Sequence, residues 1–172
     1  MIKIVLHLLL LPLCNVLIAQ DLKSLAAKEI EVENYAKAVS YLEQAVAMNP
    51  TDAEAWYRLG HCLHWLSYDS VPLPGYDQRA SNRILDCMQK ALTLDPHLRN
   101  CYSVIGSEYG ARAAHELQLG NLSGFTNQLR LGRKAGGYPD WLLEYARNIL
   151  NSCGPAAILF TGGAAEVFPI WY

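Results

Sequence analysis

Two histidines, His61 and His64, stand three residues apart with Cys62 between them. Residues at this spacing share one face of a helix, so both imidazoles would reach the same metal ion, whereas Cys62 points elsewhere. A third ligand is missing, because no Asp or Glu falls on the same helix surface near them. We therefore expect no metal and no cofactor, and we interpret both histidines as ordinary exposed or ligand-facing side chains.

The other residues with catalytic chemistry do not form a known order. Ser107 and His115 belong to no nucleophile elbow, and no glycine-rich loop that would cradle a phosphate precedes a helix. The sequence therefore predicts a protein that is not an enzyme.

Composition limits the partners of the chain. Its 172 residues suit one compact unit, and a hydrophobic content of 52% with 17% charged residues is sufficient for a folded core. The formal net charge is -2, so we expect no nucleic-acid partner, because such binding relies on clustered Lys and Arg. The 5 cysteines are too few for a disulfide miniprotein, and apolar packing must hold the fold.

Residues 1–20 have the pattern of a secretory signal peptide. One cation, Lys3, precedes a short apolar run over 4–13, and Ala19 supplies a small residue for cleavage. We expect an exported and periplasmic protein. Leu17 is larger than a cleavage site prefers, which leaves an uncleaved anchor open as the one route to a membrane.

The proposed cleavage leaves four cysteines in a compartment where thiols can be oxidised. The sequence assigns no pairing among them; they are Cys62, Cys87, Cys101 and Cys153.

An internal repeat organises the middle of the chain. An apolar helical pattern ends at Pro50, and Trp56 opens the next helix six residues later. The same arrangement recurs at Pro96 and Tyr102, and in both copies an alanine stands five residues before the proline. Such a recurrence is typical of stacked helical repeats.

The run NYAKAVSYLEQAVAMNPTDAEAWYRLG closely resembles the tetratricopeptide repeat, and ALTLDPHLRNCYSVIGSEY resembles it more loosely. The resemblance implies an all-α, right-handed array of helix-turn-helix units, with about three repeats over 21–52, 53–98 and 99–138. Extra residues in the second repeat predict a surface loop over 67–78, where prolines and a glycine break the helix. The sequence also predicts a capping box over Thr51–Glu54 and a close helix contact at Gly60.

Two segments follow the repeats. Residues 139–154 predict a capping helix whose apolar face consists of Trp141, Leu142, Tyr145 and Ile149. Residues 155–172 are apolar and lack helical periodicity, so they pack on the array, pair with a partner or belong to a domain that this chain lacks. This tail is weakly similar to bacterial membrane proteins with glycosyltransferase-like folds.

The resemblance also implies a binding surface, because in this family the first helix of each repeat lines a concave groove. It assigns Trp56, Tyr102 and Tyr109 to packing. The residues that it places in the groove are Tyr57, Arg58, His61, His64 and Trp65, followed by Asn100, Ser103, Val104 and Ser107. Aromatic residues and Arg are enriched where proteins bind one another.

We therefore expect an exported, bacterial-type scaffold or assembly factor that binds a peptide or protein segment in the cell envelope. The alternative is a regulatory or truncated fragment associated with a membrane glycosyltransferase-like system.

The predicted signal peptide is tested by the mass of the native product. We expect the mature chain to begin at Gln20 or Asp21 and to be found outside the cytoplasm, because a signal of this length is removed on export. Intact-mass measurement of the protein from each cell fraction determines both the first residue of the chain and its compartment. A chain that retains Met1 in a soluble cytosolic fraction contradicts export.

Overall fold

The computed structural model describes residues 2–68 and 76–172, with side chains from residue 15 onward. In these ranges the regular structure consists of eight α-helices and no strand, which confirms the predicted all-α array. The chain divides into two compact units, and each is described by itself. The first comprises Met1–Pro74 and Asn82–Leu98, and the second comprises Gly75–Ser81 and Arg99–Tyr172.

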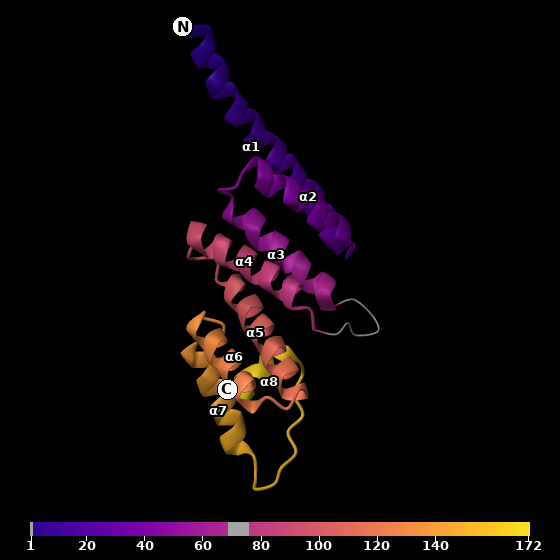
Figure 1. The fold of residues 1–172 in the computed structure, drawn as a ribbon, viewed down its shortest axis with the longest axis vertical. Helices are drawn as coiled ribbons and strands as arrows, with labels where there is room; N and C mark the ends of the chain where they lie inside the picture. The colour runs from indigo at the N-terminus through magenta and orange to yellow at the C-terminus, as the bar shows by residue number, and fades with distance from the viewer. Residues whose placement is uncertain (1, 69–75) are drawn as a thin grey trace. The chain divides into compact units, whose positions relative to one another are not determined.

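In the first unit the helices pack in the order of the sequence (Figure 1). They are α1 (Ile2–Glu31), α2 (Tyr35–Met48), α3 (Ala53–Tyr68) and α4 (Gln78–Leu94), of which the part from Asn82 belongs to this unit. The first repeat was expected to begin at residue 21, but no helix begins there, because its first helix is the continuation of α1. No proline or glycine stands between residues 13 and 31 to end the helix earlier.

Small side chains set the spacing of these helices. Ala38, Ala45, Ala55 and Ala91 have no exposed area. A Cβ atom added to Gly60 would lie 2.9 Å from the Cβ of Cys87 on α4, closer than side-chain carbons approach one another. The close contact that the sequence predicts at Gly60 is therefore confirmed.

The beginning of α3 differs from the predicted capping box. Asp52, and not Thr51, caps the helix, because its Oδ1 accepts a hydrogen bond from the N–H of Ala55 at 3.0 Å. The Thr51 hydroxyl instead donates to Oδ1 of Asn49 at 2.8 Å. The carboxylate of Glu54 is held by Arg58 and by Lys23 of α1, and these ion pairs replace the reciprocal bond of a capping box.

Both ends of the loop predicted over 67–78 are helical, because Ser67 and Tyr68 belong to α3 and Gln78 belongs to α4. Helix α3 ends at Tyr68 and α4 begins at Gln78, and residues 69–75 lie outside the described ranges.

The second unit contains the remaining four helices, α5 (Asn100–Gln118), α6 (Leu122–Lys134), α7 (Asp140–Ser152) and α8 (Ala164–Trp171). Asn121 caps α6 by accepting a hydrogen bond from the N–H of Gly124. Gly136, with φ +90°, ends the same helix in a conformation that favours glycine.

Tyr138 is the largest fully buried side chain of this unit. Its hydroxyl donates to the carbonyl oxygen of Gly106 at 2.8 Å, and its ring lies against Gly132. The turn between α6 and α7 is therefore anchored in the core by one tyrosine.

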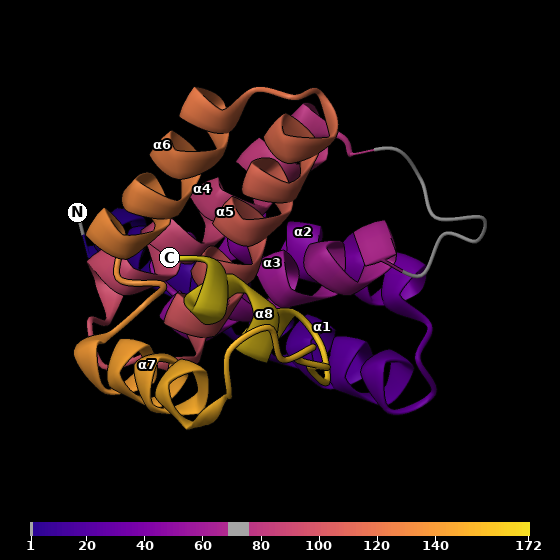
Figure 2. The same ribbon diagram turned by 90° about the horizontal axis from the view of Figure 1, so that it is seen from below.

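The tail was expected to be non-helical, and this is wrong for Ala164–Trp171, which form α8. Glu166 in the first turn accepts a hydrogen bond from the N–H of Gly162 at 2.7 Å, which stabilises the beginning of the helix. The Phe168 ring then covers Gly110 and joins a core cluster with Ala113, which places α8 beside α5 and α7 (Figure 2). The end of the tail thus packs on α5 and α7.

The apolar face predicted for α7 is also corrected. Trp141 is 69% exposed and Tyr145 is 51% exposed, whereas Ala146 is buried and Leu143 packs against the core cluster. Because α8 covers the apolar surface of α5, α7 needs only a narrow contact, and its two aromatic residues remain at the surface.

The four cysteines that the structure describes in full are free thiols, and Cys62, Cys87 and Cys101 are buried. Burial raises the pKa of Cys62 and of Cys87 to about 11, which keeps them as inert thiols at neutral pH. Among the described residues, no helix has the length and apolar character needed to cross a membrane.

Replacing Gly60 by leucine is expected to destabilise the first unit. A Cβ atom there meets Cys87 and Met88, and overpacking of a tight core costs about 1–3 kcal/mol or more. Gly154→Leu is the control, because no atom lies within 4 Å of a Cβ atom at that position. Urea denaturation of both variants measures the difference, and equal stability would refute the close contact at Gly60.

Candidate functional site

One side of α3 carries an aromatic cluster built from residues at four-residue spacing. The rings of Tyr57 and His61 have centroids 5.7 Å apart, and those of His61 and Trp65 are 6.2 Å apart. The imidazole of His64 meets the Trp65 ring edge-on at 6.0 Å. Residues four apart share a helix face, so α3 alone brings these side chains together.

Tyr35 of α2 completes this cluster. Its ring stacks on Trp65 with the centroids 6.2 Å apart and the planes inclined by 15°. The sequence interpretation missed Tyr35 as a site residue, because its helical spacing indicates packing within the repeat. We call the set of Tyr35, Tyr57, His61, His64 and Trp65 the α3 aromatic cluster.

A hydrogen bond fixes the protonation state within the α3 aromatic cluster. The indole Nε1–H of Trp65 donates to Nε2 of His61 at 3.1 Å, so this nitrogen must be unprotonated. Burial, and then the nearby His64, lower the pKa of His61 below its ordinary value of 6.5. The imidazole is therefore neutral at pH 7, and its Nε2 lone pair is already engaged and not open to a metal.

Charged groups at the beginning of α3 are paired with one another. Arg58 donates from Nε and Nη2 to Oε1 of Glu54 at 3.0 and 2.6 Å. Lys23 is buried and lies 2.8 Å from Asp52 and 3.3 Å from Glu54. The pKa of Glu54 is lowered, first by Arg58 and against the effect of burial. The cluster therefore borders a network of compensated charges.

Residues 29–66 match the family model of the tetratricopeptide repeat. The match includes every member of the α3 aromatic cluster and, with the all-helical structure, supports a helical repeat array. No curated protein and no solved structure matches the chain. Nothing in these comparisons supports the similarity of the tail to glycosyltransferase-like proteins.

Tetratricopeptide repeats in general serve as scaffolds for protein–protein interaction, and folds of this type are typically not enzymes. Among the residues that the structure describes, no group of three or more His, Cys, Asp or Glu side chains is arranged to hold a metal ion.

The groove residues predicted on α5 lie in the second unit, and the structure describes them separately from those on α3. Asn100 and Ser103 are exposed and Ser107 is half-buried, so these side chains reach the surface of their helix. Val104 does not, because it is 5% exposed and belongs to the core. The tetratricopeptide register alone had placed Val104 in the groove, and this is corrected.

The three aromatic residues assigned to packing are each half-buried. The Trp56 indole donates to the carbonyl oxygen of Pro50 at 3.0 Å, Tyr102 lies against Gly136, and Tyr109 lies against Gly132. Tyr102 and Tyr109 thus contact residues of the third predicted repeat, 99–138, whereas Trp56 contacts the end of the repeat before its own. Part of each side chain remains exposed.

The lowered pKa of His61 predicts a loss of stability in mild acid. The unfolded chain binds a proton at His61 near pH 6.5, whereas the folded chain resists it, so stability falls as the pH drops through about 6.5 and no effect is present above about 7.5. NMR titration of the Trp65 indole N–H signal measures the same protonation of His61. His64→Gln is expected to raise the pKa of His61, because it removes one of the two causes of the shift.

The matched variant is His61→Gln, which abolishes the titration of the Trp65 indole and reduces the acid-dependent loss of stability. A His61 pKa at or above 6.5 in the parent would contradict the buried, hydrogen-bonded imidazole.

Proposed function

We propose that the chain is an exported, periplasmic scaffold that binds a peptide or protein segment of the cell envelope on the α3 aromatic cluster. One observation carries the binding mode: Trp65 is 42% exposed while its ring is held by Tyr35 on one side and by the hydrogen bond to His61 on the other. An exposed aromatic ring that is already fixed loses little conformational entropy when it binds a partner.

The surroundings support the same proposal. Arg58 is half-buried beside the cluster and paired with Glu54, so it offers a planar guanidinium that is already oriented. Rings that carry a polar atom bury a large area and still form hydrogen bonds, which is why such residues dominate binding hot spots. A helix face that only contacts solvent generally carries Lys and Glu instead. Asn100, Ser103 and Ser107 of α5 remain predicted polar contacts.

Export rests on the sequence of residues 1–20, and the mass of the mature chain tests it separately from binding. Binding by the cluster does not depend on the compartment, because its residues all follow the proposed cleavage site.

Removal of the exposed anchors tests the binding face. The triple variant Tyr57→Ala, Arg58→Ala and Trp65→Ala is expected to weaken binding at least thirtyfold, since hot-spot residues each cost about 2 kcal/mol or more. The array should stay folded, because an exposed ion pair or ring stack contributes only about 1 kcal/mol. A pull-down from the envelope fraction measures binding, and circular dichroism measures folding.

The control is Tyr145→Ala, which removes an equally exposed aromatic residue from α7. Parent and control should retain the same envelope proteins, and the triple variant should lose them. A folded triple variant that retains them would place the binding site elsewhere.

A further inference from the structure

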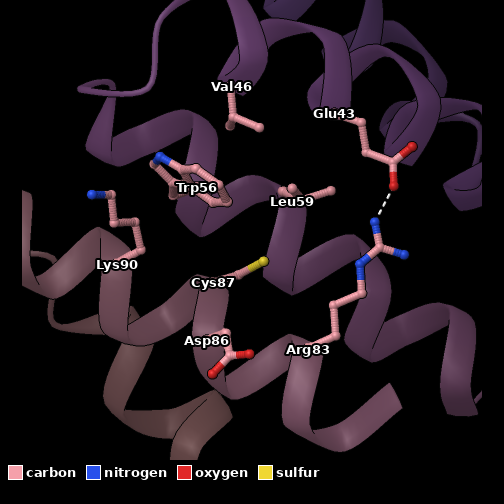
Figure 3. A pocket seen from close by; sticks show the side chains of 8 residues that line it. All are labelled: Glu43, Val46, Trp56, Leu59, Arg83, Asp86, Cys87 and Lys90. Carbon is pink, nitrogen blue, oxygen red and sulfur yellow. Dashed lines mark hydrogen bonds and ion pairs between the residues drawn. The ribbon is translucent and has the colours of Figure 1, made fainter. Parts of the chain in front are cut away.

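A second surface of the first unit is an apolar pocket on the other side of α3. It has a volume of about 530 Å³, and Figure 3 shows the side chains that line it. Its apolar wall consists of Val46 from α2, Trp56 and Leu59 from α3, and Cys87 from α4. Because successive helix residues are rotated by about 100°, Trp56 and Leu59 lie opposite His61 and Trp65. The pocket is therefore distinct from the α3 aromatic cluster.

The rim of this pocket carries two acids and two bases, so its net charge is zero. Glu43 and Arg83 form an ion pair at one end, while Lys90 lies near Trp56 at the other, with Asp86 on the α4 side between them (Figure 3). A charged ligand would attract the rim groups of opposite sign but repel those of the same sign. Because binding favours complementary potentials, such a ligand is disfavoured. The pocket suits a neutral, apolar occupant, and its volume lies within the roughly 300–1,000 Å³ of ligand sites.

The same chain presents such a segment in its second unit. Between α7 and α8 the backbone runs as an extended loop outside the helices (Figure 1). In this loop Ile158 is 82% exposed and Phe160 is 89% exposed. No charged residue stands between Arg147 and Glu166. Apolar side chains two residues apart point to the same side of an extended chain, so one surface can receive both.

We propose that the segment 157–161 of one copy docks into the pocket of a second copy, with Phe160 as the anchor. The match is one of chemistry: an apolar wall inside a rim of zero net charge meets an uncharged apolar segment whose Ile158 and Phe160 face water. If two copies each dock their segment into the pocket of the other, they form a closed dimer with a two-fold axis. If each copy docks into a different neighbour, the copies form an open chain. Either arrangement makes association depend on Phe160.

The experiment uses the full mature chain and two exposed positions. Sedimentation velocity over a concentration series is expected to show self-association of the parent. The variant Ile158→Ser with Phe160→Ser is expected to weaken it at least about thirtyfold, as for a buried aromatic anchor. Trp141→Ser is the matched control, because it removes an exposed aromatic residue from the same unit and should leave association unchanged.

A second measurement identifies the partner surface. Phe160→p-benzoylphenylalanine keeps an aromatic anchor that cross-links on illumination, and the reaction is run in a mixture of 14N- and 15N-labelled chains. The expected products are mixed-isotope dimers whose cross-link maps to the pocket wall around Val46 and Leu59. A parent that is monomeric at every concentration overturns the proposal, and so do cross-links confined to single chains or mapped to another surface.

Discussion

Contact between helices at residues with little or no side chain is the constraint on which the rest of this structure depends. In the first unit the helices meet at alanines without exposed area and at Gly60, where there is no room for one further carbon. The backbone of α3 at Gly60 thereby lies directly against the side chains of Cys87 and Met88, which sets the close approach of α3 and α4. Larger side chains must therefore lie to either side of these contacts.

Because the larger side chains lie to either side of the close helix contacts, α3 has two different surfaces. On one side Tyr57, His61 and Trp65 form a row of rings that is tied together by a hydrogen bond and by stacking on α2. On the other side Trp56 and Leu59 turn toward α4 and form an apolar pocket. The first surface is aromatic with polar atoms and the second is apolar with balanced charges, so the two favour different occupants.

Glycines also allow close contacts in the second unit. Gly106 lies against the backbone of Gly137, Gly132 lies against both Tyr138 and Tyr109 of α5, and the Phe168 ring covers Gly110. The last repeat is thus completed by a turn and by the short helix α8. A terminal repeat must cover its open apolar face, and here two rings cover it in place of a broad face of α7.

The sequence by itself determined the features that arise from short-range rules. Periodicity and the recurring prolines mark the helices of the repeats, and the place of Gly60 in the repeat predicts its close contact. The four α3 residues of the aromatic cluster could also be predicted, because residues three or four apart share one face of a helix. Only the tertiary structure decided the contacts between helices. Tyr35 of α2 reaches Trp65, and Lys23 of α1 pairs with Glu54. Residues 164–171 become helical because Glu166 binds Gly162 locally and Phe168 finds a site over Gly110. The physical reason is that helix period and caps act within a few residues, whereas these contacts depend on where the packing of the backbones places side chains distant in sequence.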